Sequence, residues 1–171
     1  MSNSRLLLLT VLMLTLAAFF ACKKDAVNQS TLHIRLTDGP GDFQQVNVDI
    51  QEIRIKSAQD SAQWITLSTN AGVYNLLDFQ NGIDTLIASG LVPPDTLKEV
   101  RFILGPNNSV MVDSVLYAME TPSAQQSGLK IKIDKKLQLD INTLILDFDA
   151  AQSVKIQGNG VYRLHPVIKL K

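Results

Sequence analysis

The feature that most constrains this chain is an alternation of apolar and polar residues in short runs. In 32–37 and in 129–133 the apolar residues occupy every second position, and similar short runs recur elsewhere: 64–67, 73–77, 100–104, 110–112, 115–117, 154–156 and 161–170. A period of two places the apolar side chains on one face of a strand. About ten short strands with frequent turn signals and no convincing helix indicate an antiparallel β-sandwich, with a closed barrel as the alternative.

One run changes phase in its middle. The apolar positions within 46–50 are even-numbered, whereas Ile53 and Ile55 are odd-numbered, so an unbroken strand would place them on opposite faces. One extra residue absorbed in a bulge restores a common face. The sequence therefore predicts a β-bulge near Gln51–Glu52.

Two segments carry hairpin signals, and one aromatic residue carries a core signal. Asp113-Ser114 separates two apolar runs, and Gly158-Asn159-Gly160 follows another. Both are rich in residues that tolerate tight turns, so we expect a hairpin at each.

Trp64, the single tryptophan, is expected in the core.

Composition narrows the classes of function. The chain has 171 residues, with 16 Lys and Arg against 16 Asp and Glu, two His and one Cys. The length suits one domain. A net charge of zero gives no electrostatic case for a nucleic-acid partner. A single cysteine excludes an internal disulfide framework and a zinc site built from cysteines.

Residues 1–21 predict a signal peptide. Met1 to Arg5 is a short polar start with one positive charge, and Leu6 to Ala21 is apolar apart from two threonines. As a helix this apolar stretch would reach about 24 Å, which is short of the roughly 30 Å hydrocarbon layer. A positive charge, a short apolar core and a small residue are typical of a secretory signal. The alternative is a membrane anchor helix.

The cysteine lies where cleavage is expected, in Phe19-Phe20-Ala21-Cys22. This segment resembles the lipobox of bacterial lipoproteins, in which the cysteine is lipidated. The next residues, Lys23-Lys24-Asp25, resemble the charged export signal of Bacteroidota lipoproteins. We therefore expect residues 22–30 to be a lipidated cysteine and a flexible tether of about 16 Å. The single domain 31–171 would then be anchored to the outer membrane and exposed at the cell surface, with a periplasm-facing anchor as the alternative.

The sequence contains none of the common catalytic patterns. G-x-S-x-G, a P-loop, a dinucleotide glycine fingerprint and H-E-x-x-H are absent. His33 and His165 lie on separate expected strands, and Pro166 holds His165 in extended geometry. We therefore expect no catalytic residues, no enzyme activity and no cofactor.

Four aspartates are the one group of residues in the sequence that offers a candidate binding site. Asp147 and Asp149 leave the same face of an expected strand. Asp38 and Asp42 bracket Gly39-Pro40-Gly41 in a tight loop. If the two segments meet, these oxygens would bind calcium or a carbohydrate. The interpretation we favour is that Asp38 and Asp149 cap turns by accepting backbone N–H groups, so that no metal is bound.

Several short motifs also follow one another in a specific order. They are Leu36-Thr37-Asp38-Gly39-Pro40, Val46-Asn47-Val48, Asn75-Leu76-Leu77, Ala88-Ser89-Gly90-Leu91, Val100-Arg101-Phe102-Ile103-Leu104, Thr121-Pro122-Ser123 before Gly128-Leu129-Lys130, Asp147-Phe148-Asp149-Ala150 and Leu164-His165-Pro166-Val167. Over residues 31–171 this series resembles a bacterial, Bacteroidota-type lipoprotein family, domain-of-unknown-function family 4382. Gly39, Pro94-Asp95 and His165 depart from its pattern. The resemblance implies an immunoglobulin- or prealbumin-like sandwich on a lipid anchor and no particular activity.

These observations converge on a lipid-anchored module of the cell envelope that is not an enzyme. We expect it to act in binding or adhesion, or as a structural module, with the membrane as a partner through Cys22, a protein or glycan as ligand, and no nucleic acid. The alternative is a calcium- or carbohydrate-binding module that uses the region of Asp38, Asp147 and Asp149.

Overall fold

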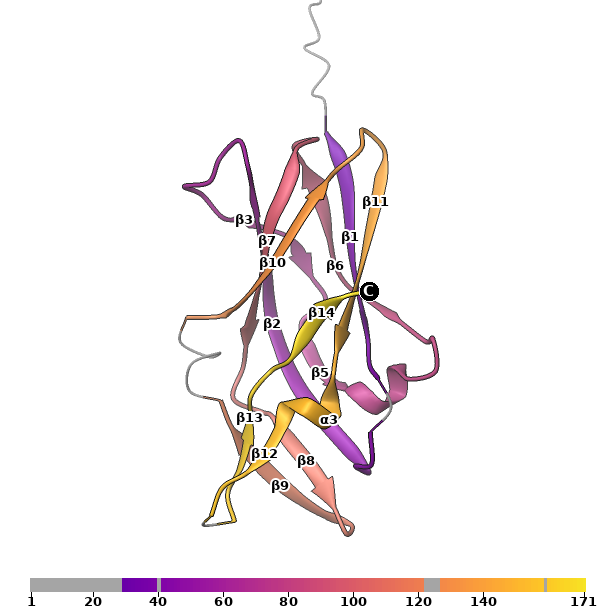
Figure 1. Ribbon diagram of the computed structural model, residues 1–171, viewed down its shortest axis with the longest axis vertical. Coiled ribbons are helices and arrows are strands. Elements are labelled where there is room, and N and C mark those ends of the chain that lie inside the picture. The colour runs from indigo at the N-terminus through magenta and orange to yellow at the C-terminus, as the bar shows by residue number, and fades with distance from the viewer. Residues whose placement is uncertain (1–28, 40, 122–126, 159) are drawn as a thin grey trace, which may run out of the picture.

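The computed structural model describes residues 29–39, 41–121, 127–158 and 160–171. These residues form two β-sheets that enclose one apolar core, with most strands running along the long axis of the molecule (Figure 1). The predicted β-sandwich is confirmed. The expected signal peptide, Cys22 and most of the expected tether lie outside the described residues.

Each sheet combines strands that are far apart in the chain. Among the described residues, the first sheet has five strands in the order β14 (Ile168–Leu170), β11 (Ile141–Phe148), β1 (Ser30–Thr37), β6 (Thr85–Val92) and β4 (Ser68–Thr69). The second has nine described strands, in the order β10 (Leu129–Lys136), β7 (Thr96–Leu104), β2 (Gln45–Ser57), β8 (Ser109–Val112), β9 (Val115–Glu120), β13 (Tyr162–Leu164) and β12 (Val154–Ile156), while β3 (Ile65–Thr66) and β5 (Gly72–Asn75) also pair with β2. In the described part of the chain, two short helices complete the fold, the 3-10 helix η1 (Leu76–Phe79) and α3 (Ala150–Ser153).

The sheets are mixed, not wholly antiparallel as the sequence predicted. β1 runs parallel to β11, with Thr31 opposite Ile141 and Thr37 opposite Asp147. β13 likewise runs parallel to β9. Parallel neighbours need a long crossover, and most of the chain lies between β1 and β11. Alternation of apolar and polar residues identifies a strand but does not indicate the direction of the neighbouring strand. The sequence therefore could not distinguish mixed sheets from wholly antiparallel ones.

The core lies between the two sheets and follows the predicted alternation. Leu32, Ile34 and Leu36 of β1 are fully buried. In β2 the pairing with β7 shifts between Ile50 and Glu52, and buried residues therefore lie on both sides of the shift. The predicted β-bulge is confirmed, and it keeps both halves of this long strand facing the core.

Both predicted hairpins form. Asp113 and Ser114 join β8 to β9 with φ of 49° and 64°, the left-handed conformation that a two-residue hairpin turn requires at both positions. β12 and β13 pair antiparallel on either side of the second predicted turn, of which Asn159 lies outside the described residues. Trp64, in contrast, is half-buried at the surface and not in the core, because it lies over the sheet against Arg101.

Candidate functional site

The structure brings three of the four candidate aspartates to one corner of the first sheet. Asp38 directly follows β1, whose last residue pairs with Asp147 of β11. Asp149 follows β11 and directly precedes α3. Burial raises the pKa of Asp38, hydrogen bonds from Ala150 and Gln80 lower this pKa, and the charges of Asp147 and Asp149 raise it.

Most oxygens of this aspartate corner already accept hydrogen bonds from the chain. Asp38 Oδ1 accepts the backbone N–H of Ala150 at 2.8 Å, and its Oδ2 accepts Nε2–H of Gln80 at 3.1 Å. Asp149 Oδ1 accepts the backbone N–H of Gln152 at 2.9 Å, which makes Asp149 the N-cap of α3. The predicted capping role of Asp149 is confirmed. Asp38 also accepts a backbone N–H, but this N–H belongs to Ala150 of the distant segment at α3 and not, as the sequence predicted, to the turn that follows Asp38.

Asp42 does not join this corner as the metal-binding alternative required. β1 ends before it, and Asp42 lies exposed on the approach to β2, where it lines a separate hollow of about 270 Å³ with Gln44, Met111 and Asp113. Among the described residues, no group of three or more His, Cys, Asp or Glu is placed to hold a metal ion. One acceptor stands apart, because Asp147 Oδ1 is buried and meets no donor in the described part of the chain.

The two histidines occupy different surroundings. His33 lies in β1 opposite Thr143 and Ser89, in the outward phase of that strand. His165 is exposed, and its backbone N–H donates to the carbonyl of Ser153 at 2.7 Å. These positions fit ordinary strand and loop residues, as the sequence predicted.

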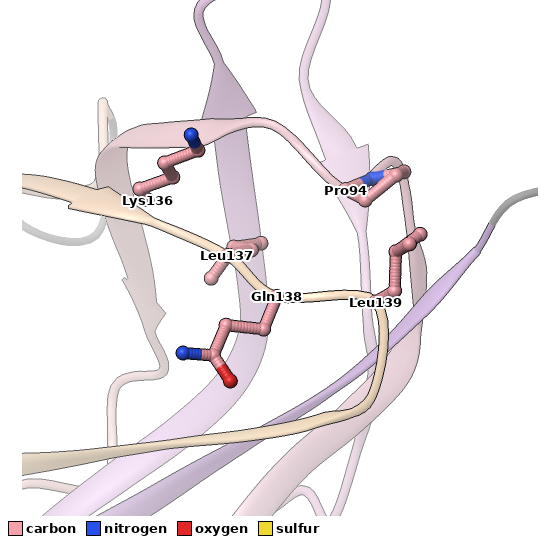
Figure 2. Close-up of a pocket in the computed structure, with 5 residues that line it drawn as sticks. All are labelled: Pro94, Lys136, Leu137, Gln138 and Leu139. Carbon is pink, nitrogen blue, oxygen red and sulfur yellow. The ribbon is translucent and has the colours of Figure 1, made fainter.

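A hollow of about 580 Å³ opens at the end of the sandwich where β1 begins. It is lined by Pro94 and by residues 136–139 (Figure 2). Lys136 and Gln138 contribute its polar side chains, and Figure 2 shows them pointing away from each other. Small-molecule sites usually have a few polar groups that converge on one point. This hollow lacks that arrangement.

The opposite end of the molecule carries an apolar surface that the sequence analysis did not single out. β8, β9, β12 and β13 extend there beyond the rest of the sandwich, and we call them the distal ribbon (Figure 1). Leu116 is 56% exposed and Ile156 65% exposed, and Val115 and Tyr117 are also exposed. Because successive side chains of a strand point to opposite faces, the run 115–117 exposes apolar groups on both faces.

Side-chain contacts join the strands of the distal ribbon. The rings of Tyr117 and Tyr162 lie 4.9 Å apart between centroids, and Ile156 pairs with Tyr162. Arg163 forms an ion pair with Glu120 at 3.0 Å across the parallel β9–β13 pair. Among the described strands, β12 is the last on this side of the sheet and forms an edge. The backbone N–H of Val154 donates to the carbonyl of Ala150, so the open part of this edge lies at Ile156.

A buried polar network roots the distal ribbon in the sandwich. Asn108 Oδ1 accepts the backbone N–H of Asp49 at 2.9 Å, and its Nδ2 donates to the carbonyl of Gly105 at 2.7 Å and to Thr121 Oγ1 at 3.1 Å. Asp49 Oδ2 accepts the backbone N–H of Asn107 at 3.1 Å. A Cβ at Gly105 would overlap the Asp49 carboxylate, so glycine permits this close approach. The network fixes the position from which β8 extends beyond the rest of the sandwich.

One sequence signal pointed to the distal ribbon. The run 115–117 has three consecutive apolar residues, without alternation, directly after the Asp113-Ser114 turn. Such a run is typical of a strand buried on both faces. Only the arrangement of the second sheet shows that this run stays largely exposed, with Tyr117 packed against Tyr162.

The fold and these surfaces define a β-sandwich module with an exposed apolar end. The sequence profile of the family described as Domain of unknown function (DUF4382) matches residues 29–166, and the chain belongs to this family. No curated protein and no solved structure matches the chain. Among the described residues, no helix is long and apolar enough to cross a membrane.

Proposed function

We propose that this protein is a non-catalytic binding module, held at the outer face of the outer membrane by a lipid on Cys22, which docks a protein partner on its distal ribbon. The observation that carries this proposal is the group of exposed apolar side chains on both faces of the ribbon. Such patches on a soluble domain mark interaction sites.

The chemistry of the distal ribbon favours a protein partner. Tyr117, Leu116 and Ile156 offer a large apolar area with one aromatic ring, which is the composition that dominates the energy of protein interfaces. The edge of β12 also presents backbone donors and acceptors to which a partner strand can add.

The position of the distal ribbon agrees with an anchor at Cys22. β1 begins at Ser30, at the end of the molecule opposite the ribbon (Figure 1). A lipid on Cys22 with a tether of about 16 Å would place that end toward the bilayer and the ribbon away from it. A periplasm-facing anchor would give the same geometry with different partners.

The docking role is tested by site-specific crosslinking in intact cells. A photoreactive residue at position 116 should give one discrete crosslinked product, and the Ile156→Ser substitution should remove that product. A photoreactive residue at position 139 is the matched control, because Leu139 is as exposed (64%) but does not belong to the ribbon. Equal products from positions 116 and 139 would contradict the docking role, and so would saturable turnover of a glycan or ester by the purified protein.

The anchor has its own test. A Cys22→Ala variant should either retain its signal peptide or, once that peptide is cleaved, be released from the membrane, whereas the wild-type chain should be cleaved and partition with membranes. Firm membrane association of a variant whose signal peptide has been cleaved would refute lipidation at this residue.

Calcium binding at the aspartate corner is a second candidate, favoured by the buried Asp147 Oδ1 that has no donor in the described chain. A bound ion would stabilise the fold by RT ln(1 + [L]/Kd). The Tm should then rise in millimolar calcium relative to chelator, and equal Tm values would eliminate this candidate.

A further inference from the structure

The outer face of the second sheet carries a block of positive charge, which we call the basic face. Its members point away from the buried side chains of the same strands: Arg54 and Lys56 of β2, Arg101 of β7, and Lys130 and Lys132 of β10. Arg54 pairs with Arg101, and Arg101 pairs with Lys130, so three cations stand side by side across adjacent strands. In the next row, Lys56 and Lys132 flank Glu99.

This arrangement costs the folded state free energy, because like charges directly opposite in a sheet destabilise it. Arg54 is compensated by Glu52, which accepts two hydrogen bonds from its guanidinium at 2.8 Å each. Among the described residues, the group that compensates Arg101 is the Trp64 ring, whose centroid lies 4.0 Å from its guanidinium carbon, and the buried Nε of Arg101 meets no acceptor there. Within the described part of the chain, neither Arg101 nor Lys130 forms an ion pair. An external anion would supply the missing compensation.

A hollow beside these rows extends the positive surface. It measures about 420 Å³, and its charged lining consists of Lys56, Lys98, Lys132, Glu99 and Asp134. Lys98 forms an ion pair with Asp134 at 2.5 Å. The two other lysines of the lining, Lys56 and Lys132, therefore share one carboxylate, that of Glu99. The chain as a whole has no net charge, so this concentration of cations is local.

We propose that the basic face binds an acidic polysaccharide, a linear chain of sugars that carry carboxylate or sulfate groups. The cations lie in rows on neighbouring strands, which are spaced by about 4.8 Å, and the rows repeat along the strands. A polymer with regularly spaced anions engages several such cations at once, each with a small gain, and releases its counterions on binding.

Two other polyanions fit this face less well. Proteins that bind membrane surfaces combine basic with apolar side chains that enter the headgroup layer. None of the most exposed large apolar side chains in the described residues lies on the basic face. Single-stranded nucleic acid needs aromatic rings on which bases stack. The aromatic ring of this face, Trp64, is already covered by Arg101 on one side.

The experiment measures binding of the full chain to dextran sulfate and polygalacturonate, with uncharged dextran as the backbone control, at several salt concentrations. The K130Q/K132Q variant should bind about tenfold more weakly, with a flatter salt dependence. The K155Q/K171Q variant has the same change in net charge away from the basic face, and it should bind like wild type. Both pairs of lysines are exposed, so a Tm no lower than that of wild type verifies that each variant folds, and K130Q/K132Q should have the higher Tm because it relieves the repulsion at Arg101.

Three outcomes would overturn the proposal. Equal weakening in the two variants would show that net charge alone drives binding. Equal affinity for uncharged dextran would exclude recognition of the anions. Tighter binding to phosphatidylglycerol vesicles or to single-stranded DNA would identify a different polyanion. None of these results depends on the lipid at Cys22 or on the distal ribbon, so the proposed function is tested separately.

Discussion

The body of the sandwich and the distal ribbon use the same hydrogen-bonded ladders, but the body buries far more of its side chains. The strands of the ribbon contribute single residues to the core, namely Val110, Met119, Val154 and Leu164. In β7, Phe102 is 0% exposed because the first sheet lies across from it. In β9, the apolar residues 115–117 are exposed because the ribbon extends past the region where the sheets face each other. Strand pairing satisfies the backbone, but burial of side chains requires a second layer. Most of the free energy of folding therefore comes from the body of the sandwich, and the exposed apolar side chains of the ribbon are available to contact a partner.

Polar groups of two kinds lie at the base of the ribbon. Asn108 is 2% exposed, and its side chain makes three hydrogen bonds to groups of the body and of the chain that follows β9. Nearby, the exposed pair of Arg163 with Glu120, the residue before Thr121, contributes little, because exposed ion pairs are screened by water. The buried hydrogen bonds of Asn108 therefore hold the base of the ribbon.

The largest expected effect separates the two regions by truncation. Phe102→Ala should lower the free energy of unfolding by about 3–5 kcal/mol, because it opens a cavity in the core. Leu116→Ala should change it by less than about 0.5 kcal/mol, because Leu116 is more than half exposed. Urea unfolding followed by the fluorescence of Trp64 measures both values. A similar loss in the two variants would mean that the distal ribbon belongs to the core.

An intermediate effect is expected at the root of the ribbon. Asn108→Ala leaves the buried N–H of Asp49 without its acceptor and should cost about 1–3 kcal/mol. Amide hydrogen exchange should then accelerate in β8 and β9 while β1 stays protected. Asn107→Ala is the graded control, because it removes the hydrogen bond from Asn107 Nδ2 to Asp49 Oδ2 at 2.9 Å, whereas the bond from the backbone N–H of Asn107 to the same oxygen survives. Its cost should be smaller than that of Asn108→Ala. Uniform acceleration across the molecule would show that the network does not act at the ribbon alone.

The smallest effect concerns pH and the aspartate corner of the body. Burial raises the pKa of Asp38 in the folded state, so folded protein binds this proton more tightly than unfolded protein. The contribution of Asp38 to stability is then full below the unfolded pKa and is lost as pH rises through the folded pKa. Wild type should therefore gain stability relative to Asp38→Asn on acidification from about pH 7 to pH 4. Unfolding curves at each pH measure this difference.

Asp42→Asn is the control for the loss of one carboxylate, since Asp42 is exposed and lies outside the aspartate corner. Its stability at pH 7 should differ from that of wild type by less than about 0.5 kcal/mol. If the Asp38→Asn curve is parallel to that of wild type, burial does not perturb Asp38.

Local structure was predictable wherever it depends on neighbours in the chain. The phase change after Ile50 predicted the bulge, because apolar residues on both sides of such a change share one face of a strand only if one extra residue is absorbed between them. Asp113-Ser114 predicted a hairpin, because these residues tolerate the left-handed conformation that the turn requires. Asp149 predicted a cap for the same local reason.

The functional surfaces were less predictable, because they depend on pairs of distant segments. The cations of the basic face come from β2, β7 and β10, and each looks like an ordinary outward residue of its own strand. Asp38 and Asp42 are four residues apart in the chain, yet only Asp38 joins the aspartate corner.

By itself, the sequence determined most of the strands, two of the turns and the apolar face of the alternating strands, because these properties depend on side-chain alternation and backbone preference over a few residues. It did not predict β6, whose residues do not alternate regularly. Only the tertiary structure decided that β1 lies parallel to β11, that the run 115–117 is exposed and that three cations stand in one row. Those outcomes depend on which strands share hydrogen bonds and which faces a second layer covers. Such long-range choices are set by the packing of the whole core, which no single segment contains.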